Sequence, residues 1–113
     1  MKDPRVYVIH IRDCIARIEM YLVEGKSSFF EDLKTQDAVI RNLEVMCDSV
    51  AKLPDDWKAA HPGTDWVNIA GFRNVLAHQY LSLDVDTVWN IIENYLPTLK
   101  QTIELIAQEF WNE

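Results

Sequence analysis

Arg73 and His78 lie five residues apart in one short segment, and their side chains have the chemistry needed to cleave a phosphodiester. An arginine guanidinium can bind two phosphate oxygens at once and stabilise the charge that grows on them during attack. A histidine imidazole titrates close to neutral pH, so it can take up or release a proton. In RNA the 2′-hydroxyl supplies the nucleophile, and no metal ion is required. Asn74, one helical turn before His78, is placed to orient the imidazole.

Each of these residues also has an ordinary structural interpretation. Arg73 would pair with Glu44 or Asp37 from another helix, because a buried guanidinium keeps its charge and requires a carboxylate partner. His78 would be a surface histidine. Tyr80, two residues further on, would be a packing residue whose hydroxyl reaches the rim of the fold. Spacing alone does not separate these interpretations from a catalytic one.

The segment that carries Arg73 has the apolar spacing of an α-helix over residues 66–81. At about 100° per residue, its apolar side chains gather on one broad stripe, and Arg73 falls near the middle. The stripe consists of Trp66, Ile69, Phe72, Leu76 and Ala77. Tyr80 lies about 20° from Arg73 on this helix, whereas His78 lies about 140° away. One straight helix therefore does not gather Arg73 and His78. We expect either a distortion near Ala77 or a homodimer in which two such helices border a shared cleft.

The composition is that of a single all-α domain covering residues 1–113. Apolar residues make up 49% of the chain, and it contains only three glycines and four prolines. No alternation typical of strands is sustained. The formal net charge of −7 argues against a broadly basic nucleic-acid binder but leaves room for a local anion site. Neither a membrane-spanning run nor an apolar signal segment is present, so we expect a cytoplasmic protein without a membrane partner.

Helix start and stop signals predict an up-and-down bundle of four principal helices plus a short helix. The expected elements are a first helix starting at Asp3, a capping box at Ser28 and Glu31, a long helix from Lys34 to Lys52, a short element from Asp55 to His61, the Arg73 helix capped by Thr64 or Asp65, and a last helix capped by Asp84 or Asp86. Pro97 lies inside the last helix, which we expect it to kink or split.

The sequence predicts neither a metal site nor a cofactor. His10 and His61 lack the spacing of metal ligands. Cys14 and Cys47 are isolated and do not form a C-x-x-C motif. We interpret the two cysteines as small apolar residues of the core.

Taken together, these segments resemble the HepT toxins, a branch of the HEPN domains. The pattern Arg-x-x-x-x-His-x-Tyr at Arg73, His78 and Tyr80 is similar to the signature of that family. The resemblance extends to flanking blocks and covers roughly residues 1–100. These blocks are 38–44, His61-Pro62, Asp65-Trp66, 69–74 and 84–89. The sequence departs from the family pattern at Gln79, where glycine is frequent, and at 47–49, where Cys-Asp-Ser replaces the expected Gly-Glu-Ala.

The resemblance implies an all-α homodimer that acts as a metal-independent endoribonuclease, the toxin of a toxin–antitoxin pair. Arg73 and His78 would be catalytic and Asn74 supporting. The substrate would be RNA, with transfer RNA as one candidate. The partner would be an MntA-like antitoxin, a minimal nucleotidyltransferase that transfers AMP from ATP to Tyr80 and so silences the toxin.

Two alternatives remain open at this level. In the first, the chain is a non-catalytic helical module that binds a nucleotide or a partner and docks to a nucleotidyltransferase, which the net charge of −7 favours. In the second, the chain is a structural dimerisation bundle in which Arg73 forms an ordinary buried ion pair.

Overall fold

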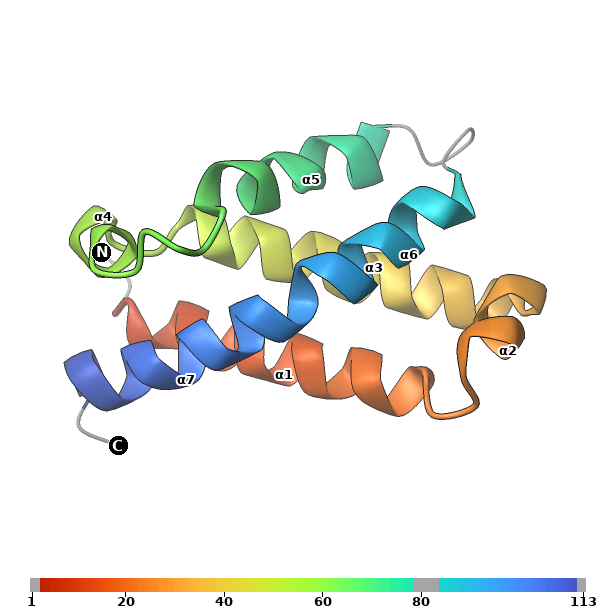
Figure 1. The fold of residues 1–113 in the computed structure, drawn as a ribbon, viewed down its shortest axis with the longest axis horizontal. Coiled ribbons are helices and arrows are strands. Elements are labelled where there is room, and N and C mark those ends of the chain that lie inside the picture. The colour runs from red at the N-terminus through yellow and green to blue at the C-terminus, as the bar shows by residue number, and fades with distance from the viewer. Residues whose placement is uncertain (1–2, 79–83, 112–113) are drawn as a thin grey trace.

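The computed structural model describes residues 3–78 and 84–111, and every regular element within these ranges is an α-helix (Figure 1). The elements are α1 (Arg5–Tyr21), α2 (Lys26–Glu31), α3 (Leu33–Ala51), α4 (Asp55–Ala59), α5 (Trp66–His78), α6 (Val85–Asn94) and α7 (Leu96–Trp111). The all-α prediction is confirmed. The principal helices are α1, α3, α5 and the pair α6–α7, and α2 and α4 are short.

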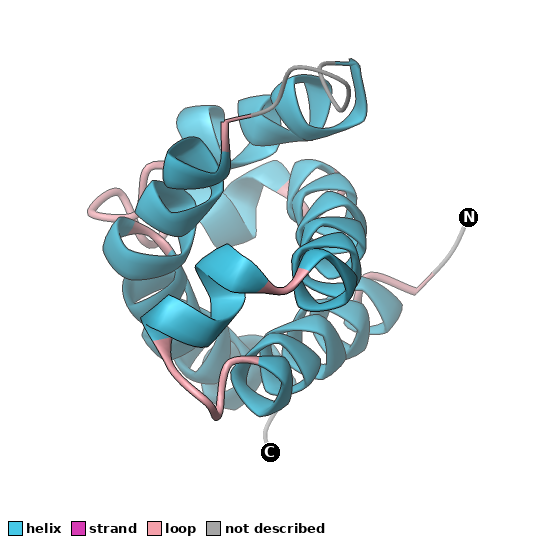
Figure 2. Ribbon diagram, turned by 90° about the vertical axis from the view of Figure 1, so that its right-hand side faces the viewer, coloured by secondary structure: helices cyan, strands magenta, loops and turns pink. Residues whose placement is uncertain are grey.

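The principal helices alternate in direction along the long axis, as expected for an up-and-down bundle (Figure 1). Figure 2 looks along that axis and shows them side by side. Helix α5 lies at one margin of the bundle, against α3. None of the helices in the described part of the chain combines the length and apolar character needed to span a bilayer.

Helix α6 ends at Asn94 and α7 begins at Leu96, so the last helix is split as predicted. Pro97 is the second residue of α7, within the first turn, where its missing N–H removes no helical hydrogen bond. The backbone N–H of Tyr95 still donates to the Ile91 carbonyl at 3.0 Å, and that of Leu99 donates to the Tyr95 carbonyl at 3.1 Å. The chain therefore changes direction at Tyr95 while its hydrogen bonding continues.

Aspartate side chains accept hydrogen bonds from backbone N–H groups at the starts of four helices, and at α1 Asp3 accepts from the Arg5 N–H at 3.0 Å. Asp32 accepts from the Lys34 backbone N–H before α3, Asp65 from that of Asn68 at α5, and Asp84 from that of Asp86 at α6. Such caps satisfy N–H groups that have no partner within the helix.

The predicted capping box at Ser28 is wrong. Helix α2 starts earlier, at Lys26, and Ser28 lies inside it. The preceding residue is Gly25, whose φ of +93° is one that glycine adopts without steric cost. The turn that glycine permits, rather than a serine side chain, sets where α2 begins.

The core lies between α1, α3 and the α6–α7 pair, and α5 covers one side of it. Its largest fully buried side chains are Phe29, Ile11, Ile18, Leu43, Met46, Ile69, Leu76, Ile91, Leu99, Ile103, Ile106 and Val8. Helix α5 contributes Ile69 and Leu76 to this set. These two residues fix which face of α5 turns inward and therefore which face remains available for chemistry.

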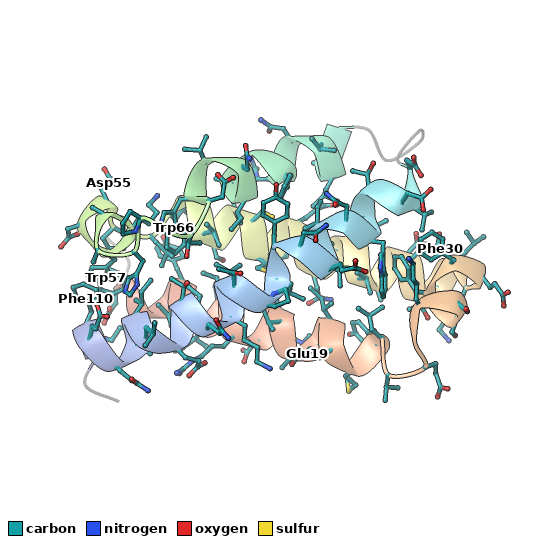
Figure 3. All side chains as sticks on the ribbon, in the orientation of Figure 1. Glu19, Phe30, Asp55, Trp57, Trp66 and Phe110 are labelled. Atoms are coloured by element: carbon teal, nitrogen blue, oxygen red, sulfur yellow. The ribbon has the colours of Figure 1, made fainter. Side chains whose placement is uncertain are left out.

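The start of α5 is held firmly against α4 and α7. The Trp66 indole N–H donates to the carbonyls of Lys58 and His61, each at 3.0 Å. Next to it, the buried hydroxyls of Thr64 and Thr102 lie 2.7 Å apart. Figure 3 shows Trp66 at the same end of the bundle as Trp57 and Phe110, whose rings stack at 5.1 Å. These contacts position the helix that carries the candidate site.

Candidate functional site

Arg73 lies at the edge of the buried face of α5. Its side chain is 54% exposed, whereas Ile69 and Leu76, at the middle of that face, are 2% and 0% exposed. Arg73 is about 40–60° around the helix from these two residues. The expectation of a buried arginine in mid-stripe is therefore wrong. The apolar stripe read from the sequence is wider than the surface that the neighbouring helices cover.

The partner of Arg73 is Asp48 of α3. The Arg73 Nε lies 3.2 Å from Asp48 Oδ1, and the other carboxylate oxygen of Asp48 accepts from Lys52 Nζ at 3.0 Å. Neither Glu44 nor Asp37, the partners considered from the sequence, forms this pair. Exposed ion pairs of this kind contribute only about 0–1 kcal/mol. A phosphate can therefore compete for the guanidinium at little cost to the fold.

Arg73 borders a small open hollow between α3 and α5. The hollow has a volume of about 200 Å³ and is lined by Arg41, Glu44, Val45, Asp48, Arg73 and Ala77. On the α5 side of the hollow, Ala77 leaves the space open, because it has no side-chain atom beyond Cβ. The volume suits a phosphate group and part of an attached sugar, with the Arg73 guanidinium on its wall.

His78 is the last residue of α5, which is α-helical from Trp66 onward. No distortion separates Arg73 from His78, so the two positions lie about 140° apart around the helix. The described structure does not bring them together within one chain. Asn74 is exposed, one turn before His78. Tyr80 lies outside the described residues.

The described residues contain no cluster of three or more His, Cys, Asp or Glu side chains that could hold a metal ion. Cys14 and Cys47 are free and buried, as expected for core residues. Burial raises the pKa of the Cys47 thiol to about 12, so this group stays protonated at neutral pH. His61 lies 3.2 Å from Glu109, through its Nε2 atom. None of these groups is among the residues that line the hollow beside Arg73.

A family model described as Ribonuclease HepT-like matches residues 11–106. The chain belongs to the HepT-like ribonuclease family. The match includes α2 to α6 in full and most of α1 and α7, so it covers the whole of α3 and α5, which carry Asp48, Arg73 and His78. The resemblance inferred from the motif is thereby confirmed at the level of the family.

Individual relatives agree with this HepT-like assignment. The chain is 35% identical over 103 residues to the "Probable ribonuclease HepT" of Thermococcus cleftensis, covering 90% of this chain and 94% of the relative. It is 28% identical over 123 residues to the "mRNA nuclease HepT" of Shewanella oneidensis, covering 88% and 92%.

A third relative, from Methanocaldococcus jannaschii, has a name that joins a gamma-glutamylcyclotransferase to an RNase. It is 30% identical over 109 residues, and the match covers 96% of this chain but only 49% of that protein. The chain thus spans about half the length of this relative. No solved structure gave a significant match.

Sequence reasoning missed Asp48 and Arg41 as neighbours of Arg73 in this HepT-like chain. A signal was present, because Arg41, Val45 and Asp48 recur at helical spacing along one face of α3. Asp48 also stands in the 47–49 segment, at the position where the resemblance led us to expect a glutamate. The departure from the pattern therefore keeps a carboxylate, on a shorter side chain, at the residue that contacts Arg73.

Proposed function

We propose that this chain is a metal-independent endoribonuclease, the toxin of a toxin–antitoxin pair, with Arg73 and His78 as catalytic residues and Asn74 in support. The observation that carries the proposal is the position of Arg73, half exposed beside an open hollow and paired at the surface with Asp48. Membership of the HepT-like ribonuclease family supports it.

In the proposed reaction the RNA 2′-oxygen attacks the adjacent phosphorus. A bond from the 2′-oxygen to phosphorus forms, the bond from phosphorus to the 5′-oxygen breaks, and a 2′,3′-cyclic phosphate results. His78 takes the proton of the 2′-hydroxyl or gives one to the departing 5′-oxygen. Arg73 binds the non-bridging oxygens and stabilises the charge that accumulates on them. Asn74 holds the imidazole of His78 in position.

A homodimer would bring Arg73 and His78 to one site. Helix α5 stays helical to His78, so a single chain turns these positions away from each other. The outward face of α5 carries Val67, which is 83% exposed, together with exposed Gly71 and Asn74. An exposed valine next to a glycine lets a second helix approach closely. We propose that two α5 helices related by a twofold axis border a shared cleft, with Arg73 of one chain at one edge and His78 of the other chain at the opposite edge.

Light scattering at micromolar concentration should therefore give twice the mass of the single chain. Val67→Glu should shift the protein to the monomer, because two glutamates would face each other across the axis. Val23→Glu is the matched control, since Val23 is 78% exposed at the end of α1 and lies far from α5. A wild-type monomer, or an equal effect of both substitutions, would contradict the proposed dimer.

The proposed partner is a nucleotidyltransferase antitoxin of the MntA kind, which would silence the nuclease by transferring AMP to Tyr80. The substrate would be cytoplasmic RNA, with transfer RNA as one candidate. The second candidate function is a non-catalytic module that docks to a nucleotidyltransferase, and the net charge of −7 favours it.

Expression without the partner separates these two functions. Inducing the wild-type chain should arrest growth, and inducing His78→Ala at the same protein level should not, because the imidazole is required for proton transfer. A binding module would give the same growth with both chains. That result would reject the nuclease and favour the alternative.

A further inference from the structure

Three of the five arginines of this chain lie on one face of the bundle, each on a different helix. Arg17 belongs to α1, Arg41 to α3 and Arg73 to α5. The other two arginines are held elsewhere in short ion pairs: Arg5 lies 2.6 Å from Asp3 and Arg12 lies 2.7 Å from Glu104. In a chain with 18 acidic residues, three arginines on one face make that face a candidate site for an anionic ligand.

The three arginines border two hollows that share one wall. The first is the hollow described above, with Arg41 and Arg73 on its lining. The second has a volume of about 330 Å³ and is lined by His10, Asp13, Cys14, Arg17 and Val45. Val45 of α3 lines both, so the two hollows adjoin across α3. Together they extend from α5 over α3 to α1.

Two further observations support the continuity of this face. The charges of Arg17 and Arg41 both act to lower the pKa of the Cys14 thiol, against the burial that raises it, so both guanidinium groups lie near this one side chain. Tyr7 and Lys52 make a cation–π contact at 6.0 Å between α1 and α3, consistent with antiparallel packing. Arg41 and Arg17 therefore lie at similar heights, about two helical turns from Asp48.

Arg41 and Arg17 are available for a ligand. The Arg41 side chain is 74% exposed, and its contact with Glu44 is long, at 3.6 Å. Arg17 is exposed and makes no ion pair with another described residue. The same face carries Asp13, Glu44 and Asp48, so it is not strongly basic. It can contact a few phosphates, but it cannot hold nucleic acid by charge alone.

We propose that Arg41 and Arg17 bind successive phosphates of the RNA strand whose scissile phosphate lies at Arg73. This inference rests on the proposed nuclease function and names the path by which the substrate approaches. Adjacent packed helices lie about 8–10 Å apart, so the path spans a short single strand. Among the described residues, those that line the two hollows include no aromatic side chain on which bases could stack. The contacts are to the backbone, and the path adds affinity without sequence preference.

The test measures binding of a labelled 2′-O-methyl RNA oligonucleotide, which lacks the attacking hydroxyl and stays intact, by fluorescence anisotropy across a salt series. Each arginine that contacts a phosphate adds about 0.7 to the slope of log K against log salt for a single strand. Arg17→Ala and Arg41→Ala should each lower the slope by about that amount and raise Kd severalfold. Arg5→Ala, which removes an exposed arginine that pairs with Asp3 at the start of α1 and lines neither hollow, should change neither.

The outcomes separate this inference from the proposed function. If the two variants lose affinity but wild-type protein cleaves no unmodified RNA, the path stands and the nuclease assignment fails. If wild-type protein cleaves RNA but Arg17→Ala/Arg41→Ala keeps the wild-type Kd and slope, the path is overturned. If that double variant keeps RNA affinity but loses binding to the purified nucleotidyltransferase, the path is likewise overturned and the face is a protein-docking surface. Unchanged melting temperatures confirm that each variant is folded.

Discussion

Replacing either Arg73 or His78 with alanine should abolish RNA cleavage while leaving the protein folded. Loss of a general acid or base typically lowers the rate about 10²–10⁴-fold, and loss of a charge-stabilising donor about 10²–10³-fold. Arg73→Lys should also be weak, because an ammonium cannot form the bidentate contact. The exposed pair of Arg73 with Asp48 contributes at most about 1 kcal/mol to the free energy of unfolding. Melting temperature and circular dichroism should therefore change little.

Product and metal dependence give independent checks on this mechanism. Cleavage should persist in EDTA and leave a 2′,3′-cyclic phosphate or its hydrolysed form, which mass spectrometry of the products identifies. Arg5→Ala is the matched control, since Arg5 is also an arginine paired with an aspartate, is 52% exposed and lies at the start of α1. Retained cleavage by His78→Ala, or a strict requirement for a divalent ion, would refute the assignment.

Mixing the two inactive variants tests whether the site is shared between protomers. If each site takes Arg73 from one chain and His78 from the other, a heterodimer of Arg73→Ala and His78→Ala keeps one intact site and has one doubly altered site. After random exchange, half of the dimers are mixed, so activity should return to about one quarter of the wild-type value. If both residues of a site came from the same chain, mixing would restore nothing.

The second large effect concerns Tyr80. Incubation with the cognate nucleotidyltransferase and ATP should add adenylate to the chain and eliminate cleavage. The tyrosine oxygen forms a bond to the α-phosphorus, and the bond from that phosphorus to pyrophosphate breaks. The attached phosphate adds negative charge close to the catalytic motif, where it can occupy the Arg73 guanidinium and exclude substrate. The core is untouched, so the melting temperature should stay close to that of the free protein.

Intact mass is the measurement, and substitutions of single tyrosines are the controls. Tyr80→Phe should gain no mass and should retain cleavage in the presence of the nucleotidyltransferase and ATP. Tyr21→Phe, which removes a half-buried hydroxyl at the end of α1, should be modified and silenced like the wild type. Equal mass gain in Tyr80→Phe, or none in the wild type, would show that Tyr80 is not the acceptor.

Much of the fold was predictable because its signals are local. Asp65 and Asp84 each begin a helix through their own side chains, and Pro97, which favours the first turn of a helix, is the second residue of α7. The failure at Ser28 has the same origin. A capping-box pattern indicates only one way in which a helix can start. Here the helix starts two residues before Ser28, after the turn that Gly25 forms with its positive φ.

The site was less predictable because it depends on how helices pack. Helical spacing placed Arg73 among apolar residues, but it could not say how far α3 and the α6–α7 pair extend around α5. Their contacts centre the buried face on Ile69 and Leu76 and leave Arg73 at its edge. Glu44 and Asp48 lie about one helical turn apart on α3. Predicting which of them pairs with Arg73 therefore requires knowing how far α3 is shifted along its axis relative to α5. That offset follows from side-chain packing between the two helices.

Cys14 and Cys47 are buried thiols whose chemical labelling can report the separation of two packed helices. Both thiols lie between α1 and α3 and are at most 1% exposed, and the pKa of Cys47 is raised to about 12. Alkylation requires both access and the thiolate, so the Cys47 thiol does not react while the two helices remain together. The rate at which an alkylating reagent labels Cys47 therefore reports how often α1 separates from α3. Arg17 and Arg41 lie on these same two helices. The labelling rate therefore also reports how often the surface that carries these two arginines is disrupted.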